Sequence, residues 1–492
     1  MALARESSMS ISIAAPPPLR FWQKAVFATG DVVDGGVNAA LGTFLLFYLT
    51  AVCGMSGSLA GLALFVTLLV DSFVDPFVGY LSDSTRSRLG RRHPFLLSAA
   101  LPLALMVALL FNIPGSLGGG GLFAYVVVIL LLERVLQSNF LLPYAAMGAE
   151  LSRDYSERSS VTAFRSLFNG LGSVMVISVG FGLFMRGPTG LLHRGAYVGF
   201  GWAAGLLVLV FALACAVGTL PLRSRLQVSV AERPPGARAF VREVGEAARN
   251  RTFMLLFATI IVFWVAQGTA GTLALHAYKY FWRLPNSFLQ LLQVFAVIGA
   301  LSGVPLSAAF LRRVAKQNVC IAGIVLFCLT QAVPPTMRIL GWLPAGGTGL
   351  FAFLSALAVV TAWAQTATGI SFLSMMADAT DEHEHLFGAR REGLFFAGAL
   401  FSSKASIAVG SLIGGVGLDL IGFPREVVRL GADPHIAAAT VRNLGLITGP
   451  GAAAIAVLCV VFLTRYSLGS DRLAAIQADL AERRTEAQAL TG

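Results

Sequence analysis

Residues 58–83 read SLAGLALFVTLLVDSFVDPFVGYLSD, an apolar run that is interrupted by two aspartates, at positions 71 and 75. An α-helix of about 20 apolar residues is long enough to cross the hydrocarbon core of a bilayer. Runs of this kind recur about every 40 residues along the chain, with short polar stretches between them. The pattern predicts an all-α membrane protein with many spans.

The composition points the same way. The chain has 492 residues, of which 56% are hydrophobic and 12% are charged, and its mean hydropathy is +0.76. A soluble domain carries about 25% charged residues, and no water-soluble fold hides this much apolar surface. We expect twelve spans, near residues 24–51, 58–83, 94–114, 121–150, 161–185, 198–220, 250–281, 287–311, 318–338, 347–377, 391–422 and 443–465.

One long polar segment, residues 221–249, divides these spans six and six. We expect two pseudo-symmetric six-helix bundles, at 23–220 and 250–466, joined by a cytoplasmic linker, with a binding site between them near the middle of the membrane. Residues 1–22 and 467–492 are expected to be cytoplasmic tails. Within the second tail, residues 470–490 are typical of a short amphipathic or solvated helix, for which a tail without a specific function is the simpler interpretation.

Basic residues set the expected orientation. They gather in the loops that follow the second, fourth and eighth spans, whereas residues 52–57 and 112–120 contain none. The positive-inside rule then puts both termini in the cytoplasm, for a protein of the plasma (inner) membrane. The same distribution explains the net charge of +11 without nucleic-acid binding. Several basic residues still fall on the opposite side: Arg186, Arg194, Lys279, Arg283, Arg338, Arg425 and Arg429.

The two aspartates of the second span are the strongest candidates for chemistry. Asp71 and Asp75 are four residues apart, so they share one helix face and repel each other. A bound cation, or a proton on one carboxylate, would relieve the repulsion. Because Pro76 has no N–H, the carbonyl of Ser72 loses its helical partner and adds an oxygen ligand suited to a hard cation such as Na⁺. The alternative is that both acids pair with lysine or arginine from other helices.

Other ionisable residues lie at similar depth, where each costs about 2.5–3.5 kcal/mol to insert. Arg134 could be a fixed positive charge that pairs with the substrate or with Asp71 or Asp75. The alternative is that it forms a purely structural ion pair. Ser138, one turn further along the fourth span, offers a hydroxyl to a cation. These additional charges are Asp31, Asp34, Glu133, Arg134 and Lys404.

Aromatic, cysteine and histidine residues give weaker signals. Trp264, Tyr278, Tyr280 and Trp282 suit either a sugar face or the interfacial belt, and for the last three we favour the belt. The five cysteines have no metal or redox spacing and are interpreted as small apolar residues. His383 and His385 could bind a metal ion, but their spacing is poor for a defined site, so a solvated loop is the better interpretation. No zinc-protease, phosphate-loop or nucleophile motif indicates an enzyme.

The stretch from Gly79 to Arg92, GYLSDSTRSRLGRR, resembles the loop signature of the major facilitator superfamily. Together with DSFVDP at 71–76, PYAAMGAEL at 143–151, ADATDE at 377–382 and the GARREG block at 388–393, it is similar to the glycoside–pentoside–hexuronide:cation symporter family. The resemblance covers about residues 22–465. It implies twelve helices in two bundles that alternate access to a central site.

The resemblance also assigns roles. It implies a coupling cation, Na⁺ or H⁺, and no other cofactor. The cation-binding candidates are Asp71, Asp75, Ser138 and Lys404. The substrate-binding candidates are Asp31, Asp34, Arg134, Arg165, Trp264 and Gln267. The gating candidates on the cytoplasmic side are Asp83, Arg86, Arg88, Arg91, Arg92, Asp378, Asp381, Arg390, Arg391 and Glu392.

Three positions depart from the family pattern. Gly35, next to Asp34, occupies the position of a sugar-binding acid in the family pattern. Leu141 occupies the position of a second acid, and Val74 that of an asparagine of the cation site. We therefore expect a secondary transporter that couples a cation to a sugar or glycoside-like solute and acts as a monomer in the bilayer. The alternatives are a proton-coupled or uncoupled carrier of a lipid-like or other organic solute, with Arg134 in place of the metal ion, and a membrane sensor or enzyme.

Overall fold

The computed structural model describes residues 18–152, 154–226, 242, 245–344, 346–389, 391–427 and 436–491. Twelve helices within these ranges are long and apolar enough to cross a membrane, as the sequence predicts. The spans of the first half are Phe21–Val52, Gly57–Ser84, His93–Leu110, Gly119–Glu150, Ser156–Phe184 and Arg194–Gly218. Those of the second half are Arg251–Phe281, Asn286–Leu311, Lys316–Ile339, Thr348–Phe387, Glu392–Leu420 and Ala438–Thr464.

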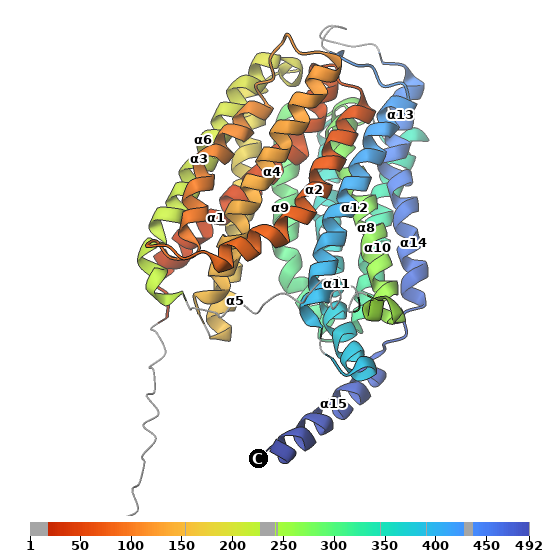
Figure 1. Cartoon of the computed structure of the whole chain (residues 1–492). Helices are drawn as coiled ribbons and strands as arrows, with labels where there is room; N and C mark the ends of the chain where they lie inside the picture. The colour runs from red at the N-terminus through yellow and green to blue at the C-terminus, as the bar shows by residue number, and fades with distance from the viewer. Residues whose placement is uncertain are drawn as a thin grey trace, which may run out of the picture.

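In the labels of Figure 1, the first half consists of α1 (Phe21–Ala40), α2 (Gly57–Ser84), α3 (His93–Leu110), α4 (Gly119–Glu150), α5 (Tyr155–Val179) and α6 (Arg194–Gly218). The second half consists of α8 (Arg251–His276), α9 (Asn286–Leu311), α10 (Lys316–Ile339), α11 (Thr348–Phe387), α12 (Glu392–Leu420), α13 (Ala438–Leu446) and α14 (Ala452–Thr464). Short π-helical segments extend α1 through η1 (Leu41–Leu45) and η2 (Tyr48–Val52), α5 through η3 (Gly180–Phe184), and α8 through η6 (Ala277–Phe281). A further π segment, η8 (Ile447–Gly451), joins α13 to α14.

Local sequence explains where several helices begin and end. The hydroxyl of Ser56 accepts a hydrogen bond from the backbone N–H of Leu59 and caps α2, and Asn250 caps α8 in the same way. Helix α11 ends at Gly388, whose φ of 73° is a left-handed conformation that favours glycine. The helix itself continues for ten residues beyond residue 377, the predicted end of this span.

The two halves repeat one packing pattern. In the first half α1 packs on α5 and α6, α3 on α6 and α4, and α2 on α4. In the second half the equivalent helices pair in the same way: α8 packs on α12 and α14, α10 on α14 and α11, and α9 on α11. The halves meet where α2 packs on α12 and α5 on α9, which are also equivalent pairs. This repetition is the expected signature of two related six-helix bundles.

Small residues let α2 and α12 approach closely at the face opposite α15. A Cβ atom added to Gly415 would lie 2.2 Å from the carbonyl oxygen of Gly57, and one added to Gly61 would lie 2.9 Å from the carbonyl oxygen of Ser411. Glycine is therefore required for this contact, as at other close helix crossings in membranes.

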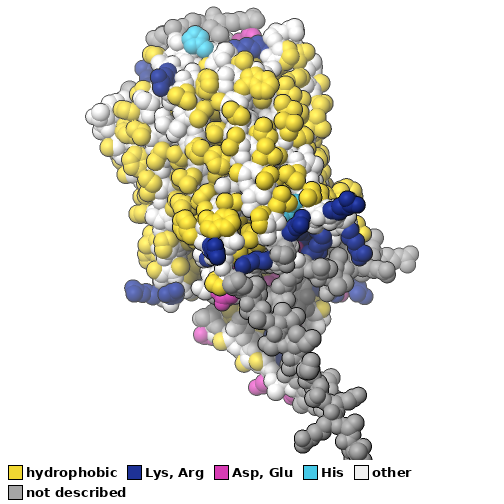
Figure 2. Space-filling view, turned by 90° about the vertical axis from the view of Figure 1, so that its left-hand side faces the viewer, with side chains coloured by type: hydrophobic (Ala, Val, Ile, Leu, Met, Phe, Trp, Pro, Cys, Tyr) yellow, Lys and Arg dark blue, Asp and Glu magenta, His cyan; other side chains and the backbone are white. Residues whose placement is uncertain are grey.

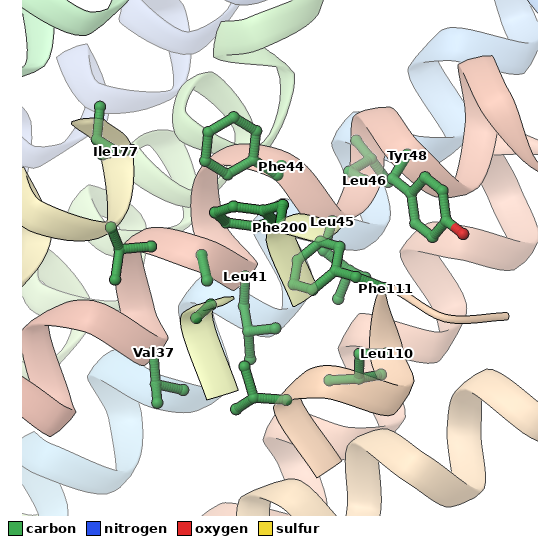
Figure 3. Close-up of a cluster of buried hydrophobic side chains, with 14 of the residues drawn as sticks. Val37, Leu41, Phe44, Leu45, Leu46, Tyr48, Leu110, Phe111, Ile177 and Phe200 are labelled. Carbon is green, nitrogen blue, oxygen red and sulfur yellow. The ribbon is translucent and has the colours of Figure 1, made fainter. Parts of the chain in front are cut away.

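The core and the outer surface differ as a bilayer requires. Buried aromatic rings join α1 and its extension to α3 and α6: Phe44 and Phe200 pack with ring centroids 4.8 Å apart, beside Phe111 (Figure 3). On the outside, hydrophobic side chains cover a broad band of the face drawn in Figure 2, and most of its basic side chains lie at the lower end. That end is the one where α15 lies in Figure 1.

The tail at the C-terminal end forms helix α15 (Ser470–Thr491), which packs against the end of α11 (Figure 1). Arg472 pairs with Glu382 at 2.8 Å, and Arg484 pairs with Glu384 at 2.9 Å. Ile476 and Leu480 are buried in the core of the second half. The helix is therefore docked on the second half and is not solvated on all sides.

Candidate functional site

The paired acids of α2 lie near the middle of that helix, which continues through Pro76. Asp71 is buried, with 4% of its surface exposed. Both carboxylates face the same neighbours, since each interacts with Lys404 of α12 and Ser138 of α4. Their predicted common face is confirmed. The site therefore draws residues from both halves of the protein.

The ammonium of Lys404 lies between the two acids. Its Nζ is 2.8 Å from Asp71 Oδ2 and 2.5 Å from Asp75 Oδ2. The hydroxyl oxygen of Ser138 is 2.8 Å from Asp71 Oδ1 and 2.7 Å from Asp75 Oδ1. The four candidates proposed for the cation site thus form one cluster, the paired-acid cluster, which carries a formal charge of −1 when both acids and the lysine are ionised.

Arg134 is not part of this cluster in the structure. Its Nε lies 3.5 Å from Glu133 Oε2, and its Nη1 donates to Gln137 Oε1 at 2.9 Å. The alternative in which Arg134 occupies the cation's place against Asp71 or Asp75 is wrong for this structure, because Lys404 holds that position. Glu133 is fully buried, and neither of its carboxylate oxygens has a hydrogen-bond donor among the described residues.

A second charged cluster lies within the first half. Arg165 of α5 donates from Nε to Asp31 Oδ2 at 2.8 Å and from Nη2 to Asp31 Oδ1 at 3.2 Å. The hydroxyl of Tyr144 also donates to Asp31 Oδ2, at 2.5 Å, and the guanidinium lies over the Tyr144 ring. A bidentate arginine–carboxylate pair of this kind fixes both side chains. Tyr144 was missed from the sequence, although it is a polar residue in an apolar span.

Asp34 lies one turn from Asp31 and is held by amides rather than cations. It accepts hydrogen bonds from Asn38 at 2.7 Å and from Asn169 at 3.0 Å. The neighbouring Gly35 has a packing reason: a Cβ there would lie 2.0 Å from the carbonyl oxygen of Asn169. No side chain fits at position 35 in this arrangement, so Asp34 is the acid that α1 presents beside the Asp31–Arg165 pair.

The candidates on α8 have different partners. Gln267 accepts a hydrogen bond from Gln365 of α11 at 2.8 Å, and Trp264 packs edge-on against Phe263. Gln365 was not predicted. A similar polar contact joins the halves, where Gln293 donates to Thr43 at 3.4 Å.

The halves are joined at the face opposite α15 by contacts that the sequence did not indicate. Asp419 of α12 accepts hydrogen bonds from the backbone N–H groups of Gly57 and Ser58, at 3.0 and 2.8 Å. His276 of α8 lies 2.9 Å from the hydroxyl of Thr50. Asn286 donates to the carbonyl oxygens of Met185 and Gly187. Main-chain groups supply most of the partners in these contacts, so no pattern of side chains in the sequence predicts the contacts.

The aromatic residues expected in the interfacial belt are partly inside this closed face. Trp282 is 6% exposed, and Tyr280 packs against Phe47 of the first half and Phe423 of the second. The belt interpretation was therefore wrong for these two residues. Tyr280 packs at the contact between the halves, and Trp282 is buried against Phe281 and Arg338 of its own half.

At the end where α15 lies, the gating candidates pair within their own half. Arg92 contacts Asp83 at 2.6 Å and Glu150 at 2.6 Å, and Arg91 also reaches Glu150. Asp378 pairs with Lys316 at 2.7 Å. Asp381 accepts a hydrogen bond from Gln477 of α15. Arg86 and Arg88 are exposed, and Arg391 and Glu392 lie at the start of α12. Arg390 lies outside the described residues.

The solvated-loop interpretation of His383 and His385 was wrong. Both lie on α11, where His383 is buried and packs against Phe387 and Phe395. His385 lies 2.8 Å from Asp479 of α15. Among the described residues there is no group of three or more metal-ligating side chains.

Comparison with known proteins identifies transporters, which agrees with the twelve apolar helices and the buried charged clusters described above. Residues 26–470 match the family described as "MFS/sugar transport protein". An uncharacterized symporter of Synechocystis is 36% identical over 172 residues, which are 34% of this chain and 31% of that protein, so the alignment spans about a third of the relative. The isoprimeverose transporter of Lactiplantibacillus pentosus is 25% identical over 77% of this chain and 76% of its own.

The fold is also that of solved transporters. A crystal structure of a mutant of the nucleoside transporter NupG aligns with a TM-score of 0.63 at 13% identity. The alignment covers 89% of this chain and 99% of that one. At this identity the likeness concerns the twelve-helix fold alone.

Proposed function

Because the chain belongs to the MFS/sugar transport family, among the glycoside–pentoside–hexuronide:cation symporters, we propose that it carries a sugar or glycoside-like solute together with one monovalent cation. The relatives and the structural neighbours are transporters, so we assign each residue a role in transport across a membrane. The protein is an integral membrane protein; in the proposed orientation both termini are cytoplasmic.

The observation that carries the proposal is that the charges of the paired-acid cluster do not cancel. Two carboxylates face one ammonium, which leaves one negative charge in a mostly buried site. Ser138 has a single hydroxyl proton, yet its oxygen lies within hydrogen-bond distance of both acids, so it satisfies only one at a time. One Na⁺ ion would balance the charge and coordinate the carboxylate oxygen that Ser138 leaves without a donor, whereas one proton on a carboxylate would balance the charge and supply the missing hydrogen bond.

The cluster also offers a route to coupling. Lys404 belongs to the second half, whereas Asp71, Asp75 and Ser138 belong to the first. A cation that binds the acids weakens their hold on Lys404, and so changes the free energy of separating α2 from α12. Binding energy that differs between two arrangements of the halves is what couples an ion gradient to a conformational change.

We place the solute between the halves, beside Asp34, Asn38 and Asn169 of the first half and Gln267 and Gln365 of the second. Carboxylate and amide groups suit the hydroxyl-rich surface of a sugar, because they accept and donate hydrogen bonds at close spacing. In this proposal Arg165 orients Asp31, and Trp264 supplies an apolar surface nearby. The name of the isoprimeverose transporter supports a glycoside as the first solute to test.

The contacts between the halves support an inward-facing state. Asp419, Thr50 and Asn286 hold the halves together at the face opposite α15, which is the outer face in the proposed orientation. Alternating access would break these contacts and bring together the gating candidates of the two halves at the other end. Arg86 and Arg88, exposed in this structure, would then meet acids of α11.

A second candidate is a carrier coupled to protons, or uncoupled, for a lipid-like or other organic solute. One observation favours it: the ammonium of Lys404 already occupies the space between Asp71 and Asp75 where a metal ion would bind. In that case proton transfer to a carboxylate, rather than a metal ion, would release the lysine.

Thermal unfolding of the purified protein separates the candidates. Stabilisation by Na⁺ that is lost in Asp71→Asn and in Asp75→Asn would assign a sodium site, and a further shift with one member of a glycoside panel would identify the solute. Stabilisation that follows pH but not Na⁺, and is lost in the same variants, would assign proton coupling. If neither Na⁺ nor pH acts through these two residues, ion coupling at this cluster is excluded.

A further inference from the structure

We propose that the closed outer face contains a binding site for an anionic group, in a cavity that spans the two halves. The cavity has a volume of about 960 Å³. Its first-half lining comes from η3 and the segment after it. Its second-half lining comes from η6, residues 283–285, the start of α9, Ile436 and Val441. Pockets of about 300–1,000 Å³ accommodate small organic molecules or headgroups.

Three cations converge on this cavity: Arg186 from the first half, and Lys279 and Arg283 from the second. Among the described lining residues there is no aspartate or glutamate. All three are exceptions to the positive-inside rule, which the proposed transport function leaves unexplained. Like charges held around one cavity repel one another. A bound anion would attract all three cations and so offset that repulsion.

Two further features make this a built site rather than a chance group of charges. The phenolic oxygen of Tyr280 is buried and has no hydrogen-bond partner among the described residues, although Tyr280 lines the cavity. A buried hydroxyl without a partner is costly, and this one belongs to a residue that lines the cavity, although the oxygen itself is not exposed to it. Arg283 has a φ of 53°, a left-handed conformation that non-glycine residues rarely adopt and that tends to persist at functional sites.

The ligand class follows from this chemistry. Lysine and arginine donate several charge-assisted hydrogen bonds, so phosphate and carboxylate groups fit best. The anion has two possible sources, which share this chemistry: the headgroup of an anionic phospholipid, or a free organic anion. Lys279 is anchored by its hydrogen bond to the carbonyl oxygen of Pro188 in the other half, at 2.8 Å. The site therefore exists in this form only while the halves are together, and an occupant stabilises the inward-facing state.

The experiment measures the unfolding temperature of the full-length protein in two arms. The first arm compares nanodiscs of phosphatidylcholine with nanodiscs that also contain phosphatidylglycerol. The second arm keeps phosphatidylcholine and adds glycerol phosphate or glucuronate to the solution. Stabilisation in the first arm alone assigns a lipid headgroup, and stabilisation in the second arm assigns a free anion.

Variants test the location. Lys279→Gln combined with Arg283→Gln should weaken the apparent affinity for the stabilising anion about tenfold or more, because two charge-assisted contacts are lost. Lys279→Arg should retain it. The matched control is Arg442→Gln, which removes an exposed charge next to the lining residue Val441 but outside the lining. No stabilisation in either arm, or an equal loss in the control variant, overturns the proposal, and either result leaves the paired-acid cluster untouched.

Discussion

The carboxylate of Asp419, in the second half, accepts a hydrogen bond from the backbone N–H of Ser58, in the first half, at 2.8 Å. Gly57, the first residue of α2, donates to the same carboxylate at 3.0 Å. Because the first N–H groups of a helix have no partner within it, an acid from elsewhere stabilises that end. Here the stabilising acid belongs to the opposite half, so the same interaction closes the outer face.

Asp419→Asn should therefore open that face more often. The lost interaction, a charged acceptor for two backbone donors, amounts to about 1–1.5 kcal/mol, or roughly a five- to twelvefold shift in population. The native Cys53 reports the change, because it lies beside this face while the other four cysteines are buried. Ser56→Ala is the control: it removes a cap of the same helix within the first half. Equal labelling of Cys53 by maleimide in both variants would contradict the assigned role.

The pH dependence of Cys53 labelling is a second prediction. Burial raises the pKa of the Cys53 thiol to about 11, and only the thiolate reacts. In the closed state the labelling rate should rise about tenfold for each pH unit up to at least pH 9, because the thiolate fraction grows in that proportion below the pKa. A rate that levels off near pH 8.5 would mean that Cys53 is solvated and the outer face is open.

Gly415→Ala should prevent full closure. The added methyl group would lie 2.2 Å from the carbonyl oxygen of Gly57, so α2 and α12 must separate. We expect faster Cys53 labelling and slower transport. Gly417→Ala is the control, since its Cβ would meet only Ile447 side-chain atoms at 3.4 Å or more. Unchanged labelling in Gly415→Ala would show that the two helices do not approach this closely in the bilayer.

Arg165→Gln should destabilise the first half. Asp31 would keep a buried charge without its cation, which costs about 3–5 kcal/mol in a fully buried pair and less, about 2–3 kcal/mol, beside a partly exposed arginine. Asp31→Asn combined with Arg165→Gln should recover much of the loss, because the orphaned charge is removed. Unfolding in denaturant measures both variants. Additive losses in the double variant would argue that the two residues do not form a pair.

Much of the architecture follows from the sequence because it depends on local apolar runs. The twelve spans agree with the structure to within a few residues at most ends. The end of α11 is the main exception: residues 378–387 are mostly polar, yet they are helical and carry the acids that pair with Arg472 and Arg484 of α15. A tertiary contact of this kind leaves no trace in a hydropathy pattern.

The site was predictable where one helix carries the signal, and less so where two helices meet. Asp71 and Asp75 share a face because of their spacing alone. That Lys404 rather than Arg134 meets them depends on how α12 packs against α2, which no single stretch of sequence determines. The outer-face contacts of Asp419 and Asn286 were missed for a related reason, since their partners are backbone groups that every residue possesses.

The most direct test of the central claim, that the paired-acid cluster binds the coupling cation, is the electrical current of proteoliposomes on a solid-supported membrane. Addition of a glycoside that the protein binds should produce a current, because a cation moves with the neutral solute. Asp71→Asn should abolish the current while leaving solute exchange across the membrane measurable. A normal current in Asp71→Asn, from protein that binds the solute and unfolds at the same temperature as the natural chain, would contradict the account.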